Sequence, residues 1–238
     1  ATALVTYGEI NTWDVSLITI MSELFYGKDT FNDDLSNWDV SGVTNMYRMF
    51  KVASSFNQNL SSWDVSSVTN MEGMFDSATS FNGDISTWDV SSVTTFSNMF
   101  VLAASFNGDI SNWNVSNVVN MESMYYHAAS FNGDISNWDV SSVTTMQRMI
   151  EHSYAFNQDI SGWDVSSVTN MRWMFNGSTS FNQDISNWDV LSVTLMTGMF
   201  DGTVAFSDEN KCAIHGSFSA NSNWPYDWSD FCPIDESD

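Results

Sequence analysis

Hydrophobic residues recur along this chain with a fixed period of 25 residues. We call each set of positions that repeats at this period a column. Tryptophan fills one column without a slip, at Trp13, Trp38, Trp63, Trp88, Trp113, Trp138, Trp163 and Trp188. Columns of Phe, Ile or Leu, Val and Met keep the same phase. A fixed period of this length is typical of a solenoid, in which each copy buries its apolar face against its neighbours.

The unit from Phe81 to Ser105 shows which elements the pattern predicts. Ile85, Trp88 and Val90 favour a short strand with one buried face. An apolar stripe at spacings of three and four then predicts an amphipathic helix after a serine N-cap, at Val93, Phe96, Met99, Phe100 and Ala103. The predicted fold is therefore α/β, a solenoid of eight 25-residue strand-helix coils over residues 1–206.

Residues 207–238 follow the last repeat and are predicted to cap it. They contain many aromatic residues and the two cysteines of the chain, Cys212 and Cys232. A disulfide between them would close a loop of about 20 residues and contribute roughly 3 kcal/mol. It would also indicate an oxidising, extracellular setting. The alternatives are reduced thiols, or a metal site for which only His215 lies close in sequence.

The repeated phrase carries a family resemblance. The I-x-x-W-x-V core resembles the leucine-rich repeat, and FNQDISGWDVSSVTNMRWMF at residues 156–175 resembles the BspA-like, DUF285 surface-protein repeat. The resemblance covers about residues 6–206. It implies a leucine-rich-repeat-like solenoid on secreted or surface-anchored proteins, with adhesive or interaction roles and no catalytic residues to carry over.

Charge restricts the partners. The chain has 6 basic and 29 acidic residues, which argues against nucleic acid and anionic membranes, since both are held by Lys and Arg. No apolar run is long enough to insert in a membrane. The expected partners are a protein or glycan on a cell surface, or copies of the chain itself stacked head-to-tail.

Enzymatic signals are close to absent. No Ser or Cys nucleophile is paired with a histidine at a recognisable spacing, so we expect no enzyme. His127 and His152 lie one period apart and are expected to stack on the outer, helical side. With Glu151 they could hold a metal ion, and coincidence is the alternative reading.

One acidic column needs an explanation, because like charges in neighbouring coils repel. It contains Asp14, Asp39, Asp64, Asp89, Asp139, Asp164 and Asp189, and is interrupted by Asn114. Hydrogen bonds from Ser and Thr of the following turn could offset the repulsion. Bound Ca²⁺ is the sharper hypothesis and a basic partner the third; no other cofactor is expected.

Other polar columns are given structural interpretations. A second acidic column is expected to bond its own backbone two residues on, at Asp34, Asp84, Asp109, Asp134, Asp159 and Asp184, with Asn59 in the gap. A column of asparagines from Asn32 to Asn182 is expected to bond backbone groups between coils. A threonine column raises the hypothesis of ice binding.

Three sequons make Asn59, Asn114 and Asn176 glycosylation candidates, although chance is an equal explanation in so Asn- and Ser-rich a chain. Departures from the repeat also make the fifth and sixth units candidates for a specialised patch. The leading hypothesis is a non-catalytic extracellular module that acts in cell-surface adhesion or as a structural subunit of an extracellular assembly. The alternative is a calcium-binding acidic scaffold that uses the stacked Asp columns.

Overall fold

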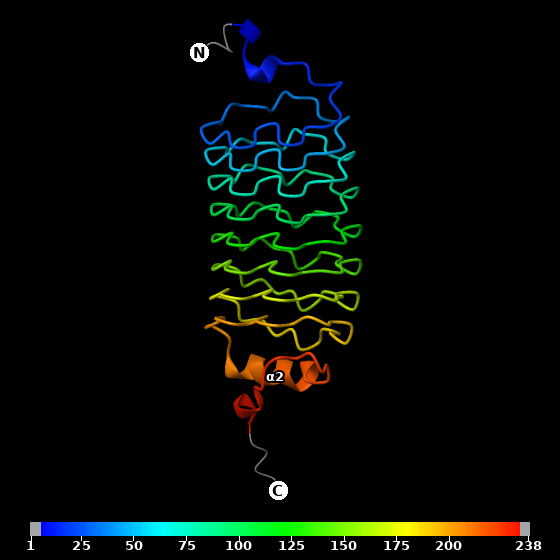
Figure 1. The fold of residues 1–238 in the computed structure, drawn as a ribbon, viewed down its shortest axis with the longest axis vertical. Helices are drawn as coiled ribbons and strands as arrows, with labels where there is room; N and C mark the ends of the chain where they lie inside the picture. Colours follow the sequence, from blue (N-terminus) through cyan, green and yellow to red (C-terminus); the bar gives the residue numbers. More distant parts are fainter. Residues whose placement is uncertain (1–5, 234–238) are drawn as a thin grey trace.

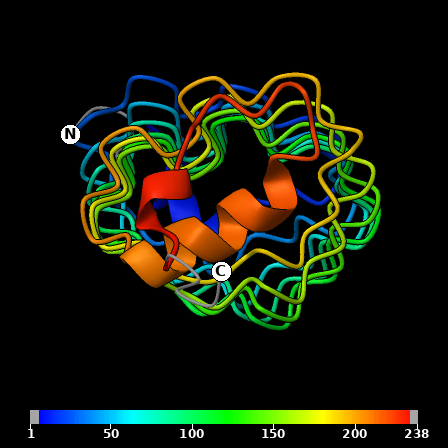
Figure 2. The ribbon, with the colours of Figure 1, turned by 90° about the horizontal axis from the view of Figure 1, so that it is seen from below.

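The chain winds into a column of stacked coils (Figure 1). The structure, a computed structural model, describes residues 6–233. The coils run from 6–30 for coil 1 to 181–205 for coil 8, and the termini lie at opposite ends of the stack. Viewed along the stack, successive coils almost superimpose (Figure 2). Residues one period apart are therefore neighbours in space. Residues 1–5 and 234–238, which the predicted domains include, lie outside the described part.

Regular elements are few. They are η1 (Ile10–Thr12), α2 (Asp208–Phe218) and η2 (Ser229–Phe231). The β structure of residues 6–233 consists of isolated parallel bridges between adjacent coils, from Ile20↔Asn45 to Asn170↔Leu195. Coils 2 to 8 contain no α helix. The predicted α/β solenoid of leucine-rich-repeat-like strand-helix coils is therefore wrong.

Consecutive tight turns occupy the positions predicted to be a helix. In coil 4 the Met99 N–H donates to the Phe96 carbonyl, three residues back (3.0 Å). The neighbouring Asn98 N–H instead donates to the Glu122 carbonyl in the next coil (2.8 Å). An α helix would direct both bonds four residues back along the same segment. Successive turns and a helix both return an apolar side chain every three or four residues, so the spacing could not separate them.

Left-handed backbone at two columns prevents a helix from continuing. The first column consists of Glu23, Arg48, Gly73, Asn98, Ser123, Arg148, Trp173 and Gly198, and the second of Gly27, Val52, Ser77, Leu102, His127, His152, Gly177 and Gly202. For a residue with a side chain this conformation costs roughly 1–2 kcal/mol. Hydrogen bonds to the next coil, repeated along the stack, hold it in place.

The columns predicted to point inward do form the core. Trp113 is 3% exposed, and its ring centroid lies 6.2 Å from that of Trp88 and 6.4 Å from that of Trp138. Its Nε1–H donates to the Ile85 carbonyl of the preceding coil (3.2 Å). The same bond recurs in every coil from Trp38 onward, so each tryptophan joins two coils through packing and through a buried hydrogen bond.

The C-terminal segment closes its end of the stack. Helix α2 lies across coil 8 (Figure 2), with Ile214 and Phe218 buried against the core. The Tyr226 hydroxyl accepts the Phe200 N–H (2.8 Å), which would otherwise face a further coil. The cap therefore supplies both apolar cover and a partner for the edge backbone.

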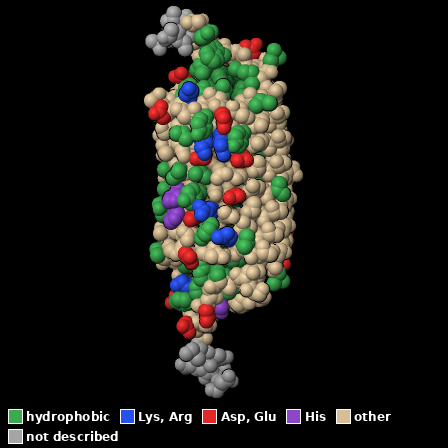
Figure 3. All heavy atoms as spheres, in the orientation of Figure 1, with side chains coloured by type: hydrophobic (Ala, Val, Ile, Leu, Met, Phe, Trp, Pro, Cys, Tyr) green, Lys and Arg blue, Asp and Glu red, His purple; other side chains and the backbone are tan. Residues whose placement is uncertain are grey.

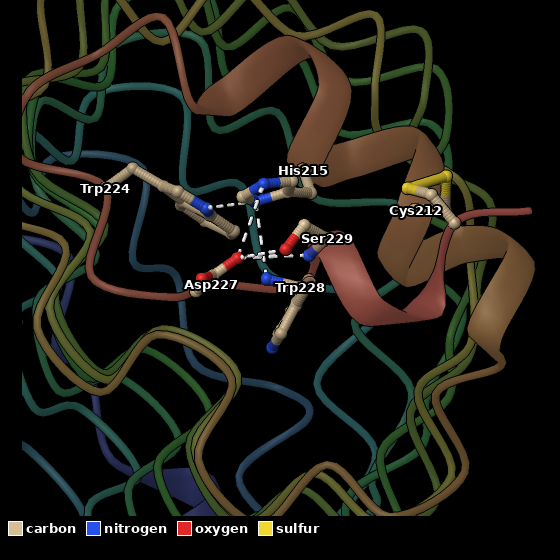
Figure 4. A network of polar contacts seen from close by, with 7 residues as sticks. Cys212, His215, Trp224, Asp227, Trp228 and Ser229 are labelled. Carbon is tan, nitrogen blue, oxygen red and sulfur yellow. Dashed lines mark hydrogen bonds and ion pairs between the residues drawn. A yellow bond between two sulfur atoms is a disulfide. The ribbon is translucent and has the colours of Figure 1, made fainter. Parts of the chain in front are cut away.

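The predicted disulfide is confirmed, and Cys212–Cys232 ties α2 to η2. Beside it, the His215 ring accepts a hydrogen bond from Trp224 Nε1 (3.2 Å), and its Nε2 lies 3.9 Å from an Asp227 oxygen (Figure 4). The predicted division into 1–206 and 207–238 falls just ahead of α2, and as a division into domains it stays a prediction.

The N-terminal end is uncovered in the described part of the chain. Trp13 is 39% exposed, Leu17 92% and Ile20 63%. Four carbonyls of coil 1 accept no backbone hydrogen bond from residues 6–233, those of Ile20, Ser22, Leu24 and Tyr26. Their counterparts one period on each accept an N–H from coil 1. This end therefore presents an apolar edge and a row of acceptors.

Candidate binding surface

The first acidic column is built from local turns. In coil 3 an Asp64 oxygen accepts both the Ser66 N–H (3.1 Å) and the Ser66 hydroxyl (2.6 Å). The serine two residues on provides both bonds in coils 1, 2, 6 and 7 as well. Leu191 leaves Asp189 with the backbone bond alone. The expectation that hydrogen bonds from the following turn offset the repulsion is confirmed.

These bonds favour the charged carboxylates. The Ser66 hydroxyl, and then its backbone N–H, lower the pKa of Asp64, while its like-charged neighbour Asp89 acts in the opposite direction. The same serine bonds lower the pKa of Asp14, Asp39 and Asp164. In these coils hydrogen bonding thus outweighs repulsion along the column.

Metal binding by the acidic column stays a prediction. Across residues 6–233, no three side chains of His, Cys, Asp or Glu converge in a way that could hold a metal ion. Neighbouring carboxylates each turn to their own serine, which occupies an oxygen that a shared Ca²⁺ would need. The combination of His127, His152 and Glu151 is likewise not such a group.

The other polar columns have the predicted structural roles. Asp84 accepts the Ser86 N–H (3.0 Å), and Asn59 accepts the Ser61 N–H in the same way (2.8 Å). In the asparagine column each side-chain oxygen from Asn32 to Asn157 accepts the N–H of the asparagine one period later, at 2.8–2.9 Å, and that of Asn182 accepts the Ser207 N–H (2.9 Å). The turn chemistry of both columns is therefore confirmed.

Two further hypotheses on surface residues stay predictions. Asn59 and Asn114 are exposed and Asn176 is half-buried, so a glycan could be attached without unfolding a coil. Ice binding by the threonine column is the second hypothesis. Its Thr69 hydroxyl donates to the Thr44 carbonyl (3.2 Å), which gives that column a structural role between coils.

One face of the column differs from coil to coil. Most exposed columns carry small polar residues in nearly every copy. Five columns instead change between small, charged and aromatic residues, and we call these columns the variable face; in coil 1 they are Ser22, Glu23, Tyr26, Gly27 and Asp29. In coil 6 the same columns carry Gln147, Arg148, Glu151, His152 and Tyr154. The side chains that the stack needs are held constant, and the variation gathers where the stack does not use them.

Cations and exposed aromatics gather on this face. Four of the six Lys and Arg residues belong to it, at Arg48, Lys51, Arg148 and Arg172. In Figure 3 the basic, histidine and hydrophobic side chains form a strip along the stack, and the surface beside the strip consists mainly of uncharged polar groups and backbone. Acidic side chains also lie in this strip, so the band mixes cations, acids and aromatic rings.

The densest part of the band lies on coils 5 to 7. The His127 and His152 rings stack with centroids 4.4 Å apart, as predicted, although on turns and not on a helix. Tyr126 meets the His127 ring edge-on (4.4 Å), and the Tyr154 and His152 centroids lie 6.0 Å apart. Burial lowers the pKa of His127, and its neighbour His152 lowers it further. At neutral pH the His127 ring is therefore uncharged.

Glu151 lies beside one of these rings, with an oxygen 3.9 Å from His152 Nε2, and is 8% exposed. Its Oε2 atom lies 3.5 Å from Arg148 Nε, but the two atoms are not aligned for a hydrogen bond, and both are buried without another partner. Burial raises the pKa of Glu151, against the smaller opposing effects of Arg148 and His152. This carboxylate is consequently a weak partner for the arginine.

Trp173 organises the basic end of the cluster. The guanidinium carbon of Arg172 lies 4.2 Å from the centroid of the indole ring, and that of Arg148 lies 4.5 Å from it. Stacking on an aromatic ring restricts the orientation of a guanidinium and leaves its donors free to bind an anion. Two arginines from adjacent coils are thus held beside one ring.

Glycines on the next coil make room for these side chains. A Cβ added to Gly198 would lie 2.5 Å from the Trp173 ring, and one added to Gly177 would lie 2.2 Å from the His152 ring. Both glycines also adopt positive φ, at 67° and 66°. Each large side chain therefore lies along the stack over a glycine, which fixes its direction.

Sequence reasoning identified part of this cluster and missed the rest. The two histidines, Glu151 and the departures in the fifth and sixth units were noticed. Arg148, Arg172 and Trp173 were missed, because they do not recur in every repeat. The signal that could have found them is the variation within each column, read across the eight copies.

The stacked coils and their repeated phrase define a repeat protein. A family model described as "Mycoplasma protein of unknown function, DUF285" matches residues 2–113, 59–154 and 96–213. These overlapping matches cover most of the chain, which therefore belongs to this family, and the resemblance drawn from the repeated phrase is confirmed. No curated protein matches the chain. In the described residues, no helix has the length and apolar character needed to cross a membrane.

Proposed function

We propose that this protein is a non-catalytic extracellular repeat module that adheres to a cell-surface partner through its variable face. The disulfide between Cys212 and Cys232 supports the extracellular setting, because such bonds persist in oxidising compartments. The description of the family leaves its function open, so the proposal rests on the surface itself.

The contrast between constant and variable columns carries the proposal. Constant exposed residues such as Asp64 and Ser66 bond one another, and the asparagine column bonds the next coil. Few side chains of the variable face make such repeated bonds, and they include the exposed Tyr26 and Tyr154 and four of the six Lys and Arg residues. Repeat proteins present their ligand-binding residues on a rigid stack in this way.

A cell-binding assay tests the proposal. Fluorescent beads coated with the protein are expected to bind cells, and a variant with Arg172→Ser and Trp173→Gly is expected to lose most of that binding. Both replacements occur at the same columns of other coils, as Ser97 and Gly198, so the fold should tolerate them. The control is Leu102→Ser, which changes the same face in coil 4. Equal binding by all three proteins would contradict the proposal.

Assembly into an extracellular structure is the second candidate, prompted by the row of carbonyls in coil 1 that accept no backbone bond from residues 6–233. The row of carbonyls there requires N–H donors from whatever covers it. At the other end of the stack, the Phe200 N–H already donates to the Tyr226 hydroxyl. Head-to-tail stacking would therefore place acceptors against a closed cap. Sedimentation velocity over a range of concentrations distinguishes the two, since adhesion by single copies predicts a monomer and assembly predicts polymers that grow with concentration.

The calcium scaffold is tested separately, because the turns around the Asp columns are complete without an ion. A bound ion would stabilise the folded state, so EDTA would lower the melting temperature if the site were occupied. We expect no change on adding EDTA. A fall of several degrees, reversed by Ca²⁺, would make the calcium scaffold the better account.

A further inference from the structure

The arginines of the variable face lack strong partners of their own. The five ion pairs among residues 6–233 include neither Arg48 nor Arg172. The pair formed by Arg148 is the long, misaligned contact with Glu151. The chain has 29 acidic residues, and a guanidinium would ordinarily pair with one of them. The Nε atoms of Arg148 and Arg172 are buried, so an anion from outside would bind their terminal Nη donors.

The cluster is also longer than a single charged group. From the two arginines at Trp173 it continues through Glu151 to the His127–His152 pair and ends at Tyr154, which is 43% exposed. Sugar rings stack their C–H faces on aromatic rings of this kind, while guanidinium groups bind carboxylates through paired hydrogen bonds. An elongated ligand that carries both features would match the whole row.

We propose that this cluster, defined by Tyr126, His127, Arg148, His152, Tyr154, Arg172 and Trp173, binds a glycan that contains carboxylated sugars. The carboxylate lies on Arg148 and Arg172, and the following sugars lie along the histidine pair and Tyr154. This assignment rests on the proposed function and specifies the ligand of the variable face.

One observation favours a glycan over an acidic peptide that adds as a strand. The backbone of this face is already bonded within the stack, since the Arg148 N–H donates to the Arg172 carbonyl (2.9 Å) and the His152 N–H to the Asn176 carbonyl (2.8 Å). A peptide therefore cannot add as a further strand.

Net charge selects among acidic glycans. At a formal charge of −23 the protein repels polyanions over a Debye length of about 10 Å. A densely sulfated chain would meet this repulsion along its whole length. A glycan with a single carboxylate among neutral sugars meets little of it, so carboxylated and sparsely charged glycans are the expected class.

A glycan array tests the assignment directly. The wild-type protein is applied to immobilised neutral, sulfated, and uronic or sialic acid oligosaccharides, and is expected to prefer the carboxylated ones. Methyl esterification of those carboxyl groups should abolish the preference. Arg172→Ser should weaken binding at least tenfold and Arg172→Lys less, because lysine keeps the charge but not the paired donors. Leu102→Ser should bind as the wild type does.

The remaining outcomes separate this assignment from the proposed function. If no carboxylated glycan binds more strongly than its neutral or esterified form, the ligand class is wrong, even if cell binding still depends on Arg172 and Trp173. Tight binding of a glutamate hexapeptide without glycan binding would also overturn it, in favour of an acidic protein partner. If cell binding does not depend on Arg172 and Trp173, the proposed function itself is wrong.

Discussion

The two kinds of surface on this column follow different rules. The constant side repeats Asp, Ser and Asn in nearly every coil, and each of these side chains satisfies a turn or the adjoining coil. The variable face changes at every coil, and its side chains pack over glycines and on one another. The difference shows how such a stack can hold its fold fixed while one face is free to change. It predicts that mutations on the two sides will have separable effects.

The largest effect is expected inside the constant columns. Replacing Trp113 with Ala removes a ring that is 3% exposed and the bond that it donates to the Ile85 carbonyl. We expect a loss of about 3–5 kcal/mol in the free energy of unfolding. Both adjoining interfaces weaken as well, so unfolding should shift to lower urea or split into two steps. Near-wild-type urea unfolding of this variant would refute the role of the tryptophan column.

A smaller loss is expected from the asparagine column. Asn107→Ala leaves the Asn132 N–H without its acceptor and removes a group that holds two coils together. The expected cost is about 1–3 kcal/mol, since the donor loses its partner. Leu102→Ser, in the neighbouring coil but on the variable face, is the matched comparison and should change the free energy by less than about 1 kcal/mol. Equal losses would show that the two sides do not differ.

Acid should weaken the constant side selectively. The pKa of carboxyls such as Asp64 and Asp84 is lowered in the folded state by serine hydrogen bonds. Their stabilisation is therefore complete above the unfolded value of about 3.9 and is lost as the pH falls through the lower folded value. Glu151 should behave in the opposite sense, because its raised pKa makes its ionisation unfavourable in the folded state.

Melting temperatures between pH 2 and 7, for the wild type and for Glu151→Gln, separate these contributions. The wild type should lose stability below about pH 4. The variant should show the same acid limb and be at least as stable at neutral pH. A variant markedly less stable at pH 7 would mean that the contact of Glu151 with Arg148 is stronger than its geometry indicates.

The smallest effect concerns the gap in the Asp column. Asn114 accepts the same two bonds from Ser116 that the aspartates accept from their serines. Asn114→Asp should keep this turn and add one like charge between Asp89 and Asp139. We expect a slight destabilisation at low salt that disappears as salt is added. Destabilisation that does not respond to salt would indicate a change in packing and not in charge.

Columns of identical residues made the interior predictable from the sequence. A residue that recurs at every period must pack against its own copies, so Trp113 and Phe81 could be placed inward without knowing the backbone. The backbone itself was mispredicted. Positive φ at Arg148 or Leu102 leaves no signature in the residue type, and glycine marks those columns in only some of the coils.

The candidate surface was only partly predictable for a related reason. Charge drew attention to the aspartates, whose oxygens are already used within their own turns. Arg148, Arg172 and Trp173 come together because positions one period apart are neighbours in space, and because glycine on the following coil leaves room for the indole. The room that this glycine leaves for the indole can be recognised only from the three-dimensional structure.

The most direct test of the account is a single exchange on the variable face. Seven replacements, each with the residue of another coil at the same column, remove the cluster: Tyr126→Asn, His127→Ser, Arg148→Gly, His152→Ser, Tyr154→Thr, Arg172→Ser and Trp173→Gly. The account predicts a urea unfolding free energy lowered by less than the loss of about 3 kcal/mol or more expected for Trp113→Ala alone, together with complete loss of cell binding. A variant that unfolds as readily as Trp113→Ala, or that still binds cells, would contradict the claim that the constant columns hold the fold and the variable face holds the function.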